Sequence, residues 1–292
     1  MFRGTFTAVV TPFRNGDIDF AAFEKLVERQ IAAGITGVVA VGTTGESPTL
    51  THDEKHEVIQ RAIKIANGGC KVIAGAGTNS TRDSIEATKF AEKAGADGAL
   101  LVAPYYNKPS QEGLFRHFKA IAGATSLPVM LYNIPGRCAV DIAADTVIRL
   151  AETCRNIVSI KEASGSVERV AELRRRLPQE FTILSGDDSL TLPFMAVGAV
   201  GVVSVASNLF PAELCALVRA CDSGDYKSAE SLHRKLFQVF KDLFIEPNPV
   251  PAKTALAWRG AMSAEVRLPL CEMSDANQTR LRKTVEEFEK AK

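Results

Sequence analysis

Short apolar runs alternate with amphipathic stretches along most of this chain. Most of the apolar runs are continuous stretches of Val, Ile, Leu and Ala, a pattern typical of parallel strands that are covered on both faces. The expected strands are residues 5–10, 37–41, 71–75, 99–103, 128–132, 157–161, 181–185 and 201–205.

The stretches between these runs have the period of helices. In the first, Phe23 and Leu26 share one face and Gly34 marks the end of the helix. The second opens with Thr51 and Glu54 at the spacing of a capping box. Eight strand–helix units of roughly 25 residues each predict an α/β fold, a (β/α)₈ (TIM) barrel.

A doubly wound sheet is the alternative α/β architecture. It is rejected because residues 75–77, Gly-Ala-Gly, lack the third glycine of the dinucleotide-binding fingerprint. After residue 205 the pattern becomes helical, over residues 211–222, 226–244, 251–260 and 274–290. We therefore expect a catalytic barrel at 1–224 and a C-terminal helical subdomain at 225–292, with 246–251 as a stiff, extended, proline-rich connector.

Charge and composition exclude several classes of protein. Lys and Arg number 35 against 34 Asp and Glu, so the chain has no basic field for nucleic acid or an anionic membrane. No apolar run approaches the roughly 18 residues that cross a bilayer. The six cysteines are scattered, with neither a Cys-x-x-Cys pair nor metal-like spacing. These features predict a soluble, cytoplasmic globular protein.

Lys161 stands at the end of the predicted strand 157–161. Burying a lysine is costly, because desolvation disfavours the ammonium ion and lowers its pKa. The neutral amine that results can attack a carbonyl carbon and form a Schiff base. The alternative is that the side chain simply extends into solvent at the rim.

Other polar residues also follow the predicted strands. In a (β/α)₈ barrel the carboxyl ends of all strands meet at one face, where reactive groups lie. Each segment alone could be an ordinary turn or rim residue, but together they predict one pocket. The segments are 42–47, 104–107, 132–137, 161–162 and 185–188.

The residue types in these segments suit a reaction between an amine and a ketone. Such a reaction moves protons repeatedly, and a phenol hydrogen-bonded to a hydroxyl can relay them. Gly42 and Gly45 are expected to allow a tight turn, so that the amides of Thr43 and Thr44 point at a carboxylate. Arg137 could bind a second carboxylate.

Four motifs carry a resemblance to a known family: GTTGES at 42–47, YNIPGR at 132–137, IKEA at 160–163 and SGDD at 185–188. In these residues and their order, the chain resembles the 4-hydroxy-tetrahydrodipicolinate synthase (dihydrodipicolinate synthase) family. That family belongs to the pyruvate-dependent class I aldolases, which include N-acetylneuraminate lyase. The resemblance extends from about residue 5 to residues 246–253 and is fainter beyond.

The resemblance implies a lyase of diaminopimelate and L-lysine biosynthesis. Lys161 would form an imine with pyruvate, and the derived enamine would attack L-aspartate 4-semialdehyde to give 4-hydroxy-tetrahydrodipicolinate. Tyr132, Thr43 and Tyr106 would relay protons, with Tyr106 entering from a neighbouring subunit. The family's usual assembly is a homotetramer, a dimer of dimers.

The resemblance also implies the binding residues. Thr44 would hold the pyruvate carboxylate and Arg137 that of the semialdehyde, while the backbone at Gly186 and Val203 would line the pocket. No metal or organic cofactor is implied, because the lysine is itself the electron sink. Cys138 departs from the family, whose synthases commonly have Thr after the arginine.

A possible allosteric L-lysine site is matched less well. Lys55 replaces a histidine of lysine-inhibited bacterial synthases, and Asp83 replaces a glutamate. A fixed cation at Lys55 would repel the ammonium of a bound lysine, so we expect weak or absent feedback inhibition. The matching positions are Ser47, His52, Lys55, Asn79, Asp83 and Tyr105.

Three other functions remain open from the sequence. The acceptor could be a sugar acid, as in N-acetylneuraminate lyase or a 2-keto-3-deoxy sugar acid aldolase, although Arg137 suits a small acidic aldehyde better. His52 and His56 have i, i+4 spacing, which could indicate a metal-dependent aldolase, but no third ligand is in view. A non-catalytic barrel would have no need of the nucleophile and its relay.

Overall fold

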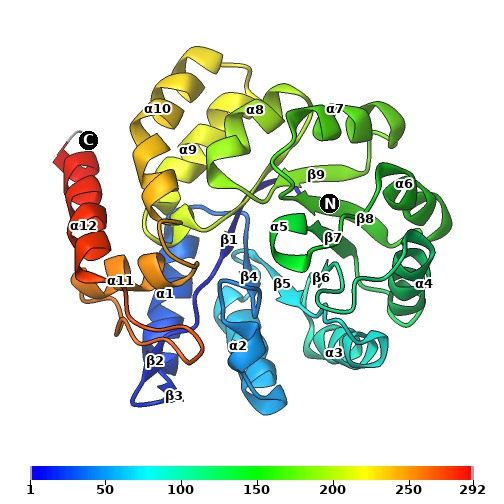
Figure 1. Cartoon of the computed structure of the whole chain (residues 1–292), viewed down its shortest axis with the longest axis horizontal. Coiled ribbons are helices and arrows are strands. Elements are labelled where there is room, and N and C mark those ends of the chain that lie inside the picture. Colours follow the sequence, from blue (N-terminus) through cyan, green and yellow to red (C-terminus); the bar gives the residue numbers. More distant parts are fainter. Residues whose placement is uncertain (1, 291–292) are drawn as a thin grey trace.

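The computed structural model describes residues 2–290, and its centre is a closed barrel of eight parallel strands (Figure 1). Around the barrel the strands follow the order β1-β10-β9-β8-β7-β6-β5-β4. The predicted (β/α)₈ fold is confirmed, and no strand end differs from the prediction by more than two residues. The strands are β1 (Gly4–Ala8), β4 (Gly37–Ala40), β5 (Lys71–Gly75), β6 (Gly98–Val102), β7 (Val129–Asn133), β8 (Ile157–Glu162), β9 (Thr182–Ser185) and β10 (Gly201–Ser204).

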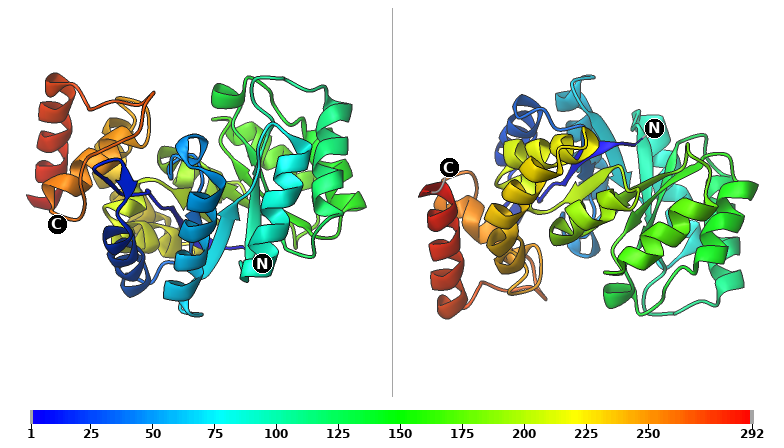
Figure 2. Two further views of the ribbon diagram at one scale, coloured as in Figure 1. Left: turned by 90° about the horizontal axis from the view of Figure 1, so that it is seen from below. Right: turned by 90° about the horizontal axis from the view of Figure 1, so that it is seen from above.

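Helices cover the outside of the barrel, between consecutive strands (Figure 2). The capping box before α2 is present: Thr51 Oγ1 accepts from the Glu54 amide at 3.2 Å, and Glu54 Oε2 accepts from the Thr51 amide at 2.8 Å. The helices are α1 (Phe20–Ala32), α2 (His52–Ala66), α3 (Thr81–Ala94), α4 (Gln111–Ala122), α6 (Ala144–Thr153), α7 (Val167–Arg176), α8 (Thr191–Ala196) and α9 (Pro211–Asp222).

Shorter elements lie in the connections. The β2–β3 hairpin (Phe13–Arg14 and Asp17–Ile18) precedes α1, and the single-turn α5 (Pro135–Cys138) follows β7. Residues 2–290 also include three 3₁₀ turns: η1 (Ser47–Thr49), η2 (Asp188–Leu190) and η3 (Ala206–Asn208). Two of them, η1 and η2, follow strand ends at which polar residues were expected to cluster.

The interior of the barrel has its own hydrophobic core, separate from the core under the helices. Phe6 is fully buried in it, and Phe2 packs edge-on against Phe6 with ring centroids 6.0 Å apart. Because the side chains of a strand alternate between its faces, every second residue of each strand enters this core. Tyr132 of β7 belongs to it, and its register partner on β8 is Lys161.

Three further helices follow in the described part of the chain, α10 (Tyr226–Asp242), α11 (Val250–Trp258) and α12 (Asp275–Lys290). They lie at one side of the barrel, where α10 packs against α9 and α12 packs against α10 and α11 (Figures 1 and 2). The division of the chain at residues 224 and 225 stays a prediction. It falls between α9 and α10, which pack directly on each other.

The connector between α10 and α11 differs from the expected extended segment. The amide of Val250 donates to the carbonyl of Pro247 at 3.0 Å, so the segment is a turn. It brings the buried side chain of Asn248 over the barrel, against Thr44.

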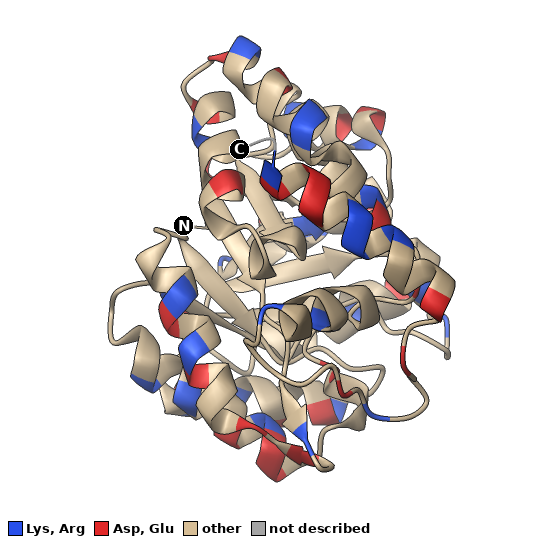
Figure 3. Ribbon diagram, turned by 90° about the vertical axis from the view of Figure 1, so that its left-hand side faces the viewer, with Lys and Arg blue, Asp and Glu red and all other residues tan. Residues whose placement is uncertain are grey.

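Lys and Arg alternate with Asp and Glu along the outer helices, as expected for the balanced charge (Figure 3). All six cysteines are free thiols. Among residues 2–290, no helix is both long and apolar enough to span a membrane.

Candidate active site

Lys161 is buried within the barrel, at the carboxyl end of β8. Only 6% of it is exposed, and its Nζ lies 4.1 Å from the centre of the Tyr132 ring. The alternative in which the lysine extends into solvent is therefore wrong. The next residue, Glu162, points to the opposite face of the strand, because side chains alternate.

Burial changes the protonation of this lysine. The pKa of Lys161 is lowered to about 7, mainly by desolvation; the Asp188 carboxylate opposes this shift and the Arg137 cation adds to it. Near neutral pH a large share of the amines is therefore uncharged and can act as a nucleophile.

Tyr132 is the neighbour of Lys161 on the adjacent strand and is 4% exposed. Burial raises the pKa of its phenol, although Arg137 and a hydrogen bond with Thr43 oppose the shift. The phenol thus stays protonated in the pocket and can exchange its proton with the Thr43 hydroxyl. The structure brings together three of the four predicted catalytic residues: Lys161, Tyr132 and Thr43.

The turn after β4 carries Thr43 and Thr44. It is closed by hydrogen bonds from the Gly45 amide to the Gly42 carbonyl, at 3.0 Å, and from the Glu46 amide to the Thr43 carbonyl, at 3.1 Å. In the part of the chain that the structure describes, no hydrogen bond uses the amide of Thr43 or Thr44. Both amides can thus serve an incoming carboxylate.

Neither glycine of this tight turn has a left-handed backbone. The left-handed residues of this turn are Val41, with φ 59°, and Glu46, with φ 55°. Gly45 is instead needed for space, since a Cβ there would lie 3.3 Å from the Val9 carbonyl oxygen and 3.2 Å from Thr11 Oγ1. Gly42 has only an ordinary contact at its Cβ position, 3.6 Å from Val39.

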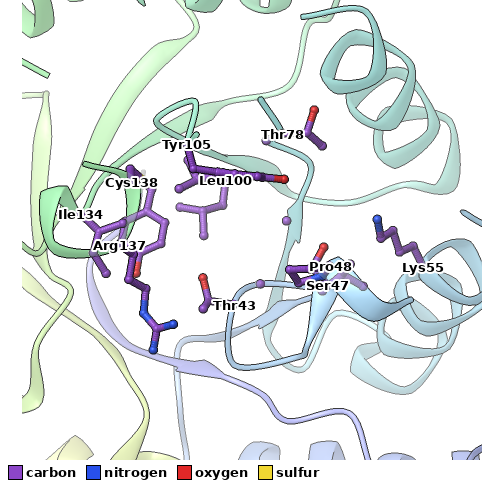
Figure 4. Close-up of a pocket in the computed structure, with 16 residues that line it drawn as sticks. Thr43, Ser47, Pro48, Lys55, Thr78, Leu100, Tyr105, Ile134, Arg137 and Cys138 are labelled. Carbon is purple, nitrogen blue, oxygen red and sulfur yellow. The ribbon is translucent and has the colours of Figure 1, made fainter. Parts of the chain in front are cut away.

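Arg137 and Cys138 belong to the short helix α5 and line a pocket of about 180 Å³ (Figure 4). Arg137 is exposed, and its Nη2 donates to the Asn248 carbonyl at 3.4 Å. Burial raises the pKa of the Cys138 thiol to about 11, so the thiol is uncharged. Tyr132 and Thr43 line the same pocket.

Gly186 packs directly on the lysine. A Cβ at this position would lie 3.1 Å from both Cγ and Cε of Lys161 and 2.8 Å from the Ala163 Cβ. Any larger residue would displace the nucleophile. Val203, in β10, is buried in the interior core of the barrel together with Tyr132.

A network behind the site was missed from the sequence. Glu162, fully buried, accepts from Arg169 Nε at 2.8 Å, from Asn133 Nδ2 at 3.1 Å and from the Ser164 amide at 2.8 Å. A buried carboxylate needs such partners, and these fix the end of β8. The sequence signal that could have indicated this network is the acidic residue directly after the lysine at the end of the strand.

Asp188 was also missed as an individual residue. Its Oδ2 accepts from the amides of Val205 and Ala206 at 3.0 and 2.9 Å, while its buried Oδ1 has no hydrogen-bond partner in the described chain. Burial raises the pKa of Asp188 to about 6. It is the carboxylate that raises the pKa of Lys161.

The candidate allosteric residues separate into two groups. Ser47, Lys55 and Tyr105 also line the pocket, and Ser47 and Lys55 lie on the side away from Arg137 (Figure 4). We call these three residues the outer part of the pocket. The other three, His52, Asn79 and Asp83, do not line it. Asp83 nevertheless acts on the outer part of the pocket, because its charge raises the pKa of Lys55 against the lowering effect of burial.

Tyr106, the fourth predicted catalytic residue, lies outside the pocket. It is 90% exposed and has a left-handed backbone, with φ 71°. A subunit-crossing role for it stays a prediction.

The two histidines of the alternative metal site have other surroundings. His56 stacks on Phe90, with ring centroids 3.4 Å apart, and His52 is exposed. Within residues 2–290 no group of three His, Cys, Asp or Glu residues could hold a metal ion.

The fold and the site together define a (β/α)₈-barrel enzyme with a buried lysine amine and a phenol–hydroxyl pair at the carboxyl ends of its strands. The chain belongs to the dihydrodipicolinate synthetase family, whose model matches residues 1–288. This confirms the resemblance found in the motifs.

Similar proteins come from several bacterial groups. The 4-hydroxy-tetrahydrodipicolinate synthase of Aquifex aeolicus (strain VF5) is 48% identical over 288 residues, covering 99% of this chain and 98% of that protein. A solved structure of the synthase from Methylacidiphilum fumariolicum SolV is 56% identical, with a TM-score of 0.98 over 99% of this chain and 97% of that one. The relatives are synthases, so a sugar-acid lyase is not favoured.

One solved relative has lysine bound. The structure of the enzyme from Cyanidioschyzon merolae with lysine bound is 43% identical, with a TM-score of 0.96 over 98% of both chains.

Proposed function

We propose that this protein condenses pyruvate with L-aspartate 4-semialdehyde to 4-hydroxy-tetrahydrodipicolinate, through an imine on Lys161. The observation that carries the proposal is the buried amine with its pKa near 7, beside Tyr132 on the neighbouring strand. Membership of the dihydrodipicolinate synthetase family supports the choice of substrates.

In the first half of the reaction, the neutral Lys161 amine attacks the keto carbon of pyruvate. Loss of water gives a protonated imine, and removal of a methyl proton gives the enamine. Tyr132 and Thr43 are placed to carry these protons, because the phenol is protonated at neutral pH and contacts the hydroxyl. No metal or organic cofactor takes part in this chemistry.

In the second half, the enamine carbon forms a bond to the aldehyde carbon of the semialdehyde. The amino group of that substrate then adds to the imine carbon and displaces the Lys161 amine, which closes the ring and frees the enzyme. The free amides after β4, at Thr43 and Thr44, are suited to the pyruvate carboxylate. The Arg137 guanidinium, at the pocket wall, suits the second carboxylate.

The assembly that we propose is a homotetramer built from two dimers. Tyr106 supports it, because its side chain is 90% exposed in the single chain, on a left-handed backbone with φ 71°. Completion of the partner's relay would bury this side chain at an interface.

The test is a coupled assay with pyruvate and L-aspartate 4-semialdehyde, in which added dihydrodipicolinate reductase and NADPH report the product. In parallel, borohydride reduction in the presence of pyruvate should give an adduct on Lys161, identified by peptide mass. Turnover with the adduct is the expected result. An adduct without turnover would contradict the acceptor but not the imine, and the absence of both would overturn the proposal.

A further inference from the structure

A buried ion pair joins the C-terminal helices to the turn after β4. Lys253 of α11 donates from Nζ to Glu46 Oε1 at 2.6 Å, and the two side chains are 0% and 1% exposed. The same Nζ donates to the Thr11 carbonyl at 2.9 Å and lies 4.1 Å from the centre of the Phe13 ring. The amide of Arg267 donates to Glu46 Oε2 at 3.1 Å. Both charges are thus fully partnered.

Stability alone is a weak reason for such a pair. Removing two charges from water costs several kcal/mol for each ion, and apolar residues of similar volume often stabilise a protein as well or better. Burial lowers the pKa of Lys253 to about 8, although Glu46 raises it. The pair is costly to bury, but its directed hydrogen bonds hold both residues in one geometry. It is therefore better suited to positioning the backbone than to stabilising the fold.

The pair positions the turn after β4, which carries the free amides of Thr43 and Thr44. Glu46 is the last residue of this turn, and its left-handed backbone, with φ 55°, is unfavourable for a residue with a side chain. The pair holds Glu46 there through its side chain, while Thr11 Oγ1 holds the preceding Gly45 carbonyl at 2.8 Å. The backbone between Gly42 and Glu46 is therefore restrained from both sides.

A second contact from the same segment reaches the turn directly. Asn248 Nδ2 donates to Thr44 Oγ1 at 2.9 Å, and the Asn248 carbonyl accepts from Arg137. The segment from Asn248 to Lys253 therefore contacts both places where we put substrate carboxylates.

We infer that the Glu46–Lys253 pair is a positioning device, which holds the turn after β4 so that the amides of Thr43 and Thr44 meet the pyruvate carboxylate. The inference rests on the proposed function, because it assumes that pyruvate binds at this turn. Helix α11, which lies outside the barrel, is thereby part of the catalytic machinery. Neither residue of the pair touches the substrate.

The test compares Lys253→Met, Glu46→Gln and the double variant by steady-state kinetics and thermal unfolding. Lys253→Met leaves a buried carboxylate unpaired, so the turn shifts and KM for pyruvate rises roughly tenfold to a hundredfold, with a smaller fall in kcat. Glu46→Gln keeps a hydrogen-bond acceptor for Lys253, and its KM rises less.

The double variant separates positioning from stability. It has no unpaired charge, so we expect it to regain much of the Tm that Lys253→Met loses while KM for pyruvate stays raised. If the pair is only structural, the double variant regains both, and the inference is overturned. The double variant also keeps the test informative if Lys253→Met fails to fold.

A matched control is Asp242→Asn, which weakens another buried charge of the C-terminal helices. Asp242 is 1% exposed and accepts from Arg280 Nη2 at 2.7 Å and from Thr284 Oγ1 at 2.6 Å. It should lower Tm without changing KM for pyruvate. An equal rise in KM would overturn the inference, since any loosening of these helices would then be enough.

The borohydride adduct distinguishes this inference from the proposed function. A wild-type enzyme that forms no pyruvate adduct overturns the proposed function. A wild-type enzyme that forms it, with KM for pyruvate unchanged in Lys253→Met, overturns only the role of the pair.

Discussion

Two lysines at the site differ in their surroundings. Lys161 does not line the pocket itself but lies inside the barrel against Tyr132, which does; it is 6% exposed, and burial lowers its pKa to about 7. Lys55 lines the pocket, as do Ser47 and Tyr105. Burial also lowers the pKa of Lys55, but Asp83 opposes the shift.

The difference shows that the degree of burial decides whether a lysine can act as a nucleophile. An enclosed amine loses its hydration and becomes a nucleophile near neutral pH, whereas a carboxylate near a half-buried amine favours its charged form. Lys161, inside the barrel, can therefore do covalent chemistry. Lys55, at the pocket wall, is suited to attracting or repelling charge.

The largest effect is expected from removing the inner amine. Lys161→Ala should lower kcat/KM by about 1,000-fold or more, because no imine can form. Both the coupled assay and the borohydride adduct check this result. Lys241→Ala, which removes an exposed lysine of α10, is the control and should behave like the wild type. Undiminished turnover in Lys161→Ala would show that the imine mechanism is wrong.

The next effect comes from the proton relay. Tyr132→Phe keeps the ring over the lysine but removes the hydroxyl, and it should lower kcat about 100-fold. Tyr226→Phe, at a half-exposed tyrosine of α10, is the matched control. If kcat of Tyr132→Phe stays within a factor of two of the wild type, Tyr132 does not carry protons in this reaction.

The pH dependence follows from the same amine. Below its pKa of about 7 the amine is protonated, so kcat/KM for pyruvate should fall about tenfold for each pH unit below 7 and level off above it. A profile that stays flat down to pH 5 would contradict the assigned nucleophile.

A smaller change tests the carboxylate beside the lysine. Asp188→Asn keeps an acceptor for the amides of Val205 and Ala206 but removes the charge that raises the pKa of Lys161. The midpoint of the kcat/KM profile should therefore move to lower pH. An unchanged midpoint would show that Asp188 carries no charge in the free enzyme, and an upward shift would contradict its assigned effect on Lys161.

The smallest effect concerns the outer part of the pocket. We expect half-maximal inhibition only above millimolar L-lysine, because the Lys55 cation repels the ammonium of the ligand. Lys55→His should strengthen inhibition, measured against the uninhibited rate of each variant. Submillimolar inhibition of the wild type would show that the charge of Lys55 does not govern the site.

Much of the barrel and part of the site could be predicted from local patterns. The continuous apolar runs located the strands, and the lysine at the end of one run identified the nucleophile. The prediction was weaker where the backbone conformation depends on contacts. The left-handed residues of the turn after β4 are Val41 and Glu46, and not its glycines. Contacts from Lys253 and the Arg267 amide hold the side chain of Glu46, and these residues are distant in the sequence.

The sequence by itself determined the order of strands and helices, the caps of the helices and the chemistry available at each strand end, because these depend on neighbours within a few residues. Tertiary structure alone decided the contacts across the chain. Lys253 meets Glu46 across 207 residues, and Asn248 meets Thr44 across 204. The periodicity and motif spacing of the sequence do not predict such pairs. They form only where the folded barrel brings distant segments together and excludes water from them.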